Sequence, residues 1–224
     1  MTGSRHFKVA GLVAIIWMTG CASFEPALRT SDLVRARQPS VAETQDGLEI
    51  SVEEFITPDK SRQAFDADLA SYGVLAMLVR AENKGVGHYK IAQRSITAAV
   101  GGQALPAIGA VDAANQAATS EYAGKALGWT VAAGPFAILL WPVTIAGSAA
   151  HTQSVNRRIQ QHFESLQLTD ALIKPNQTAT GFVYFKLPED SKKLEHLVIE
   201  ATATEDPGGK QLSFKLSVPA IALQ

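Results

Sequence analysis

Residues 212–218 read Leu-Ser-Phe-Lys-Leu-Ser-Val, and apolar side chains alternate strictly with polar ones along this stretch. Successive side chains of a β-strand point to opposite faces, so the alternation predicts a strand with one buried and one exposed face. Residues 48–53, Leu-Glu-Ile-Ser-Val-Glu, show the same pattern and predict a second half-buried strand. These two stretches place the chain among the β proteins.

Four further stretches carry strand signals, and turn residues separate them. They are residues 72–83, 88–100, 180–187 and 194–204. The first begins with a continuous apolar run, as in a strand of a sandwich core, and Asn83-Lys84-Gly85 follows it as a turn. Six or seven short strands with this punctuation predict a mainly β fold, an antiparallel sandwich built from residues 47–103 and 169–224.

Two segments resemble the immunoglobulin-like (telokin-like) domains of bacterial lipoproteins. Residues 79–84, Val-Arg-Ala-Glu-Asn-Lys, are similar to the V-x-x-x-N-K pattern of that family at the end of a strand. Residues 175–185 are similar to its P-x-x-x-x-x-G-x-x-x-F entry into a strand. The resemblance implies an immunoglobulin-like sandwich that serves as a structural or interaction module and carries no catalytic residues.

The N-terminal segment has the pattern of a targeting signal. Arg5 and Lys8 are followed by an uninterrupted apolar run over residues 9–18 and then by small residues. This order is typical of a secretory signal peptide. The apolar run is shorter than the roughly 20 residues that span a bilayer as a helix. We therefore expect residues 1–20 to be removed after export.

Met18-Thr19-Gly20-Cys21 resembles the lipobox of bacterial lipoproteins, with Met18 where leucine is commonest. The resemblance implies that the Cys21 thiol receives a diacylglyceryl group, that the chain is cut before it, and that a fatty acid such as palmitate acylates the new amine. Cys21 is the only cysteine, so an internal disulfide is excluded. Ala22 stands where aspartate commonly signals inner-membrane retention, which implies the cell outer membrane, facing the periplasm. An ordinary secretory peptide and a retained anchor are the alternatives.

Residues 21–46 are mostly polar, carry Pro26 and Pro39, and show no strand alternation. This composition predicts a lipidated tether that holds the folded domain away from the lipid surface. The alternative is an ordered arm that packs on the domain.

Residues 104–168 interrupt the β pattern and predict an apolar α-helical insertion, which makes the fold α+β overall. Residues 126–156 contain no Asp, Glu, Lys or Arg, and residues 128–150 are numerous enough to cross a bilayer. Pro135 and Pro142 interrupt any single helix there, so we expect two short helices or a hairpin. The candidate contacts with membrane or partner chains are Trp129, Phe136, Leu139, Leu140 and Trp141.

Small residues recur at every fourth position of this insertion, a spacing that allows close helix packing. They are Ala110, Ala114 and Ala118, and then Gly124, Gly128 and Ala132, which are the candidates for helix packing. Three interpretations remain open: insertion into the membrane, self-assembly through the small-residue faces, and a buried hairpin that caps the β domain.

Residues 155–168 show an amphipathic helical pattern at the end of the insertion. Ile159, Phe163 and Leu166 fall near one side, and Arg157 and Arg158 fall on the other. This pattern suits a helix that covers the sandwich and also one that lies along a membrane surface.

No pattern typical of a catalytic or metal site occurs in the sequence. The histidines lack ligand spacing, and Asp66 and Asp68 lack a third ligand. Glu53 and Glu54 are neighbours on a predicted strand, so we expect them to point to opposite faces and not to form a pair. The net charge of −1 provides no basic excess for nucleic-acid binding. We expect no enzymatic activity, no cofactor and no metal.

These features predict a membrane-anchored envelope lipoprotein that acts as a structural or protein-interaction module. Its expected partners are the membrane, through the lipid on Cys21, and protein chains or further copies of itself. The alternative is an accessory lipoprotein that binds or transports lipid or another hydrophobic ligand, in which the insertion would line an apolar cavity.

Overall fold

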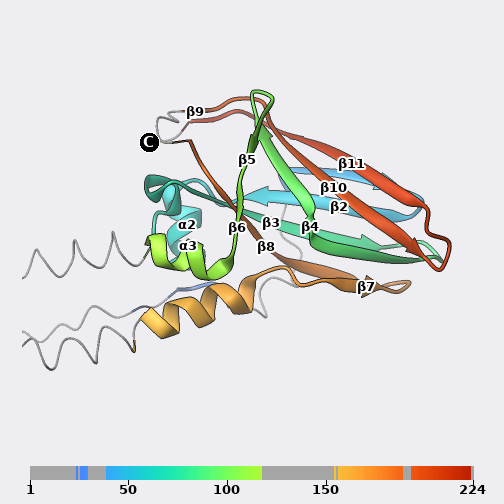
Figure 1. Cartoon of the computed structure of the whole chain (residues 1–224), viewed down its shortest axis with the longest axis horizontal. Helices are drawn as coiled ribbons and strands as arrows, with labels where there is room; N and C mark the ends of the chain where they lie inside the picture. The colour runs from blue at the N-terminus through green and yellow to red at the C-terminus, as the bar shows by residue number, and fades with distance from the viewer. Residues whose placement is uncertain are drawn as a thin grey trace, which may run out of the picture.

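The structure is a computed structural model, and it describes residues 24, 26–29, 39–117, 154, 156–188 and 193–222. Two antiparallel five-stranded sheets stack face to face, and helices cover the outer face of one of them (Figure 1). The described part is therefore a three-layer arrangement, a β-sandwich with a helical layer on one side.

Sheet A has the strand order β1-β2-β3-β8-β6. Its strands are β1 (Val41–Gln45), β2 (Leu48–Glu54), β3 (Val74–Asn83), β8 (Thr178–Lys186) and β6 (Ala107–Ile108). Sheet B has the order β11-β10-β4-β5, and β7 also pairs with β4. Its strands are β11 (Gln211–Val218), β10 (Leu197–Asp206), β4 (His88–Val100), β5 (Gln103–Leu105) and β7 (Ala171–Ile173). Two short strands, β9 (Lys193–Leu194) and β12 (Ile221–Ala222), pair with each other.

The core between the sheets is built by the alternating strands. Leu48, Ile50 and Val52 on β2 face it, and every second residue of β11 is buried there. The alternation recognised in the sequence is therefore confirmed, and the exposed positions of β11 form part of the outer face of sheet B.

The middle of sheet A, where β3 pairs with β8, is buried on both faces, which explains the continuous apolar run of β3. On β8, Val183 and Phe185 join the core between the sheets, while Phe182 and Tyr184 join a second core under the helices. A strand covered on both sides loses the apolar–polar alternation because neither of its faces meets water.

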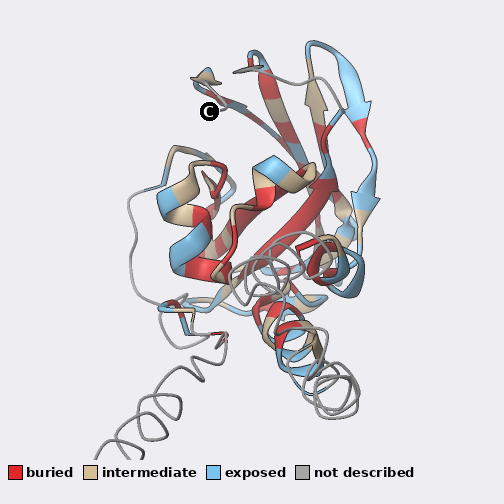
Figure 2. Ribbon diagram, turned by 90° about the vertical axis from the view of Figure 1, so that its left-hand side faces the viewer, coloured by how far each residue is buried: buried red, intermediate tan, exposed pale blue. Residues whose placement is uncertain are grey.

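The helical layer consists of α2 (Pro58–Phe65), the 3-10 turn η2 (Leu69–Tyr72), α3 (Ala110–Ala117) and a helix over residues 156–166. Its centre is an aromatic cluster in which the Phe65 ring lies 4.8 Å from Phe163 and 4.9 Å from Phe182. The helices in Figure 2 are buried on the side that faces the sheet and exposed on the other.

The two lateral edges of the sandwich are closed in different ways. At one edge, Gln45 and Glu43 of β1 bind the backbone of β11, at Ser213 O (2.7 Å) and Lys215 N (2.8 Å). At the other edge, the chain passes from β5 in sheet B directly into β6 in sheet A. Side chains or chain crossings thus occupy edges that would otherwise be open to pairing with another strand.

The boundaries of several predicted segments need correction. Residues 41–45 form β1 and are not part of a tether, and residues 104–108 continue the sheets as β5 and β6 before any helix begins. The single strand predicted over residues 194–204 is two strands, because the chain turns at His196 with a positive φ of 55°. The apolar alternation shifts by one position at this turn, from Leu194 to Leu197 and Ile199, and a single strand cannot accommodate that shift.

Candidate functional site

The residues that the sequence singled out for lipid, membrane or helix contact lie outside the described residues. They are Cys21, Gly124, Gly128, Trp129, Ala132, Phe136, Leu139, Leu140 and Trp141. In the part of the chain that the structure describes, no helix is long and apolar enough to cross a membrane.

The two described ends of the insertion pack on sheet A. The first two residues of the small-residue series, Ala110 and Ala114, are buried against the aromatic cluster, as are Ile159, Phe163 and Leu166 of the returning helix. Asn115 on α3 accepts a hydrogen bond of 2.8 Å from Gln160, which joins the two helices. These two ends therefore cap the β domain, and the helix over residues 156–166 covers the sandwich; the segment between them, with the predicted hairpin, lies outside the described residues.

Part of the predicted tether is also packed on this layer. Phe24 and Leu28 are only 5% and 3% exposed and belong to the core under the helices. The Phe24 ring lies edge-on to His162 at 5.3 Å, and Leu28 N donates to Gln63 O at 2.9 Å. The alternative of an ordered N-terminal arm is thus correct at these two positions. The apolar character of Phe24 and Leu28 was the signal for it.

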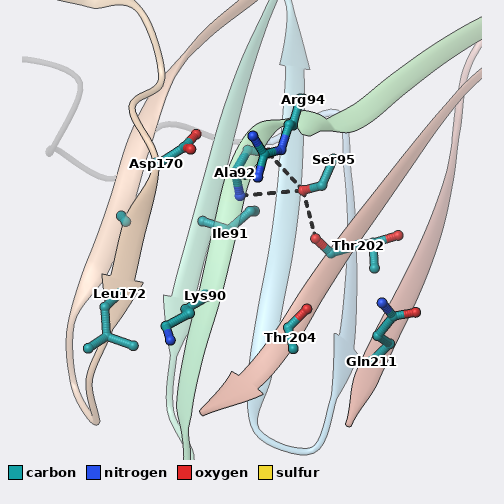
Figure 3. Close-up of a pocket in the computed structure, with 11 residues that line it drawn as sticks. Lys90, Ile91, Ala92, Arg94, Ser95, Asp170, Leu172, Thr202, Thr204 and Gln211 are labelled. Carbon is teal, nitrogen blue, oxygen red and sulfur yellow. Dashed lines mark hydrogen bonds between the residues drawn. The ribbon is translucent and has the colours of Figure 1, made fainter. Parts of the chain in front are cut away.

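A groove of about 640 Å³ lies on sheet B, along β4 between β7 and β10 (Figure 3). It exists because β4 and β10 lose register: residues 92–95 of β4 bulge opposite Thr202. The Ser95 hydroxyl holds the bulge, since it lies 2.7 Å from both Ala92 O and Thr202 O and donates to one of them. Both partners are backbone carbonyl groups, so Ser95 stabilises the backbone of the bulge.

The walls of the groove combine charge with apolar surface. Asp170 accepts a hydrogen bond from Gln93 N at 2.9 Å, and Lys90 binds Asp206 at 2.8 Å. Arg94 and Leu172 are exposed beside them. Such a lining suits a polar, extended contact such as a peptide or protein loop. Sequence reasoning did not predict this groove, although Gln93-Arg94-Ser95 is a polar run within an otherwise regular strand.

Two neighbouring carboxylates share one cation. Glu53 and Glu54 both contact the ammonium of Lys60, at 3.3 Å and 2.9 Å. Lys60 lies on α2, which follows the end of β2, and from there it reaches side chains on both faces of the strand. Burial raises the pKa of Glu54, but hydrogen bonds from Ser40 and Lys60 outweigh it and hold that pKa below its ordinary value.

The described histidines occupy three different places in the fold. His162 donates from Nε2 to Ala64 O at 2.7 Å, and burial lowers its pKa while this bond partly offsets the effect. His88 and His196 are exposed on separate elements. Among the described residues, no three His, Cys, Asp or Glu side chains are placed to hold a metal ion.

Comparisons with known proteins add little to this description. No protein-family model matches the chain, and no curated protein sequence matches it. One similar solved structure is that of a chain from Bacillus subtilis, ycdA, provisionally described as a lipoprotein, with 12% identity and a TM-score of 0.35. The overlap covers 81% of this chain and 39% of that one, so this chain spans well under half its length. A TM-score this low carries no argument about fold or function.

Proposed function

We propose that this chain is a bacterial envelope lipoprotein that acts as a non-enzymatic structural or protein-interaction module. The observation that carries the proposal is the order of the first 21 residues: Arg5 and Lys8, the apolar run 9–18, and Gly20-Cys21 with the only cysteine of the chain. A thiol at this position is the acceptor that lipoprotein processing requires.

Three acyl chains on Cys21 would make membrane attachment nearly permanent. Each buried methylene group contributes about 0.8 kcal/mol, and a single chain gives only marginal, reversible binding. We place the protein at the outer membrane, facing the periplasm, because Ala22 rather than aspartate follows the cysteine. In this proposal residues 128–150 contact the membrane or partner chains.

In this proposal the β-sandwich is the part of the chain that acts as the interaction module. We propose that it is immunoglobulin-like and that a partner contacts its groove on sheet B, where Arg94 and Leu172 are exposed. The alternative, a carrier of hydrophobic ligands, requires an apolar cavity lined by the insertion. The groove does not favour that alternative, because none of the described residues of segment 104–168 lines it.

The test is the intact mass of the full chain extracted from bacterial membranes. We expect the mass of residues 21–224 plus a diacylglyceryl group and an amide-linked acyl chain. Cys21→Ser should lose both additions, and Ser23→Ala is the matched control that should keep them. A bare Cys21, or residues 1–20 still attached to the mature protein, would overturn the proposal.

A further inference from the structure

We infer that the folded domain docks directly on the membrane through the surface around Phe24 and Leu28, with α2 and the helix over residues 156–166 nearest the lipid. We call this surface the N-terminal clamp: Phe24 and Leu28 together with Gln63, Arg158 and His162, which contact them. The inference rests on the proposed lipidation of Cys21.

The clamp holds the chain at several points. The Phe24 ring packs on His162, and Arg158 Nη2 donates to Phe24 O at 3.5 Å. Leu28 N donates to Gln63 O at 2.9 Å. Full burial of a Phe or Leu side chain favours the packed state through the hydrophobic effect. Two such side chains and a backbone hydrogen bond are sufficient to keep this segment on the domain.

The covalent chain then limits where the lipid can be. Three residue steps separate Cys21 from Phe24, and each spans at most about 3.6 Å, so Cys21 lies within about 11 Å of the clamp. The membrane surface must pass through the lipidated cysteine. A 25-residue tether would allow any orientation, whereas an attachment this short does not.

The charges at the clamp are compatible with a phospholipid surface. Arg157 and Arg158 are exposed on the helix that holds Phe24, and Glu164, exposed on the same helix, offsets one of them. Each cation near an anionic surface strengthens membrane binding only modestly. This contribution is small, so we assign the orientation mainly to the short covalent reach.

The far end of the molecule is at the β3–β4 and β10–β11 connections, opposite the helices (Figure 1). Val86 lies in the β3–β4 connection and is 95% exposed. In the docked orientation this end projects away from the membrane. The groove on sheet B then remains accessible to a partner.

The experiment compares a fluorescent label at two engineered cysteines, Gln161→Cys beside the clamp and Val86→Cys at the far end. The acylated Cys21 thiol does not react, so each variant carries one label. The full-length lipoprotein is reconstituted in vesicles of phosphatidylethanolamine and phosphatidylglycerol that contain a headgroup-attached quencher. We expect quenching at position 161 to exceed that at position 86 several-fold.

The double variant Phe24→Ala, Leu28→Ala frees the segment while leaving Cys21 intact. We expect it to stay bound to the vesicles and to lose most of the difference between the two labels. Equal quenching at the two positions of the otherwise unchanged protein, or a preserved difference in the double variant, would overturn the inference. Failure of lipidation is a separate outcome, because the mass of the same preparation reports it directly.

Discussion

At the scale of single residues, Asn83 shows how one buried polar group can join several segments. Its side chain is fully buried, where Nδ2 donates to Gly87 O (2.7 Å) and Ile173 O (3.1 Å) and Oδ1 accepts from Gly85 N (3.0 Å). These hydrogen bonds stabilise the connection between β3 in sheet A and β4 in sheet B and link it to β7. The sequence marks Asn83 only as the beginning of a turn.

Asn83→Asp should therefore destabilise the protein at neutral pH although the side chains have the same size. The carboxylate keeps the hydrogen bond from Gly85 N but cannot donate to the two carbonyl oxygens, and a buried charge that faces two acceptors costs about 2–4 kcal/mol. Urea unfolding measures the change. The control is Asn176→Asp, an exposed residue with φ of 62° in the neighbouring loop, which should change stability by less than about 0.5 kcal/mol. Equal effects of the two substitutions would contradict the role assigned to Asn83.

Glu54 should make stability depend on pH in the acid range. Its pKa is lower in the folded protein than the ordinary 4.5, so the unfolded chain binds the proton more tightly. The contribution of Glu54 to stability is therefore complete above that value and is lost as pH falls through the lower, folded pKa.

Glu54→Gln should remove this dependence and lower the free energy of unfolding at neutral pH by about 1–3 kcal/mol. Urea unfolding curves at neutral pH and at about pH 3 provide the measurement. We expect the difference between the original protein and the variant to shrink as the pH falls. The control is Glu200→Gln, which alters an exposed carboxylate. If the stability difference between the original protein and Glu54→Gln did not depend on pH, the role assigned to Glu54 would be wrong.

At the scale of elements, the insertion is the part whose role differs most between its ends and its middle. Its ends, α3 and the helix over residues 156–166, are helices of the capping layer, with Ala113 and Phe163 fully buried. The segment from 128 to 150 lies outside the described residues, and membrane insertion stays a prediction for it.

Cys21→Ala separates the two sources of membrane attachment. If residues 128–150 insert in the bilayer, the variant stays in the membrane fraction after cell breakage and a high-salt wash, because an apolar segment of that length holds the protein without lipid. Immunoblotting of the membrane and soluble fractions measures the distribution. Release of the variant into the soluble fraction would show that the lipid is the only anchor and that membrane insertion by this segment is wrong.

At the scale of the whole molecule, the sequence by itself determined the longer strands and the class of fold. The alternation along residues 48–53 and 212–218 predicted β2 and β11 closely, and the turn residues on either side of residues 88–100 predicted β4, because strand periodicity and turn chemistry are local properties. The N-terminal signal pattern is local in the same sense, and it carries the proposed function.

Only the tertiary structure decided how these strands are layered and what lies against them. The burial of Phe24 under the helices, the contact of Lys60 with two neighbouring glutamates and the groove at the β4 bulge all join residues distant along the chain or on different elements. Such contacts depend on how separate elements pack, and no pattern within one segment encodes them. The apolar run of β3 illustrates the limit: it showed that the strand is buried, whereas only packing showed that a second sheet covers one face and helices cover the other.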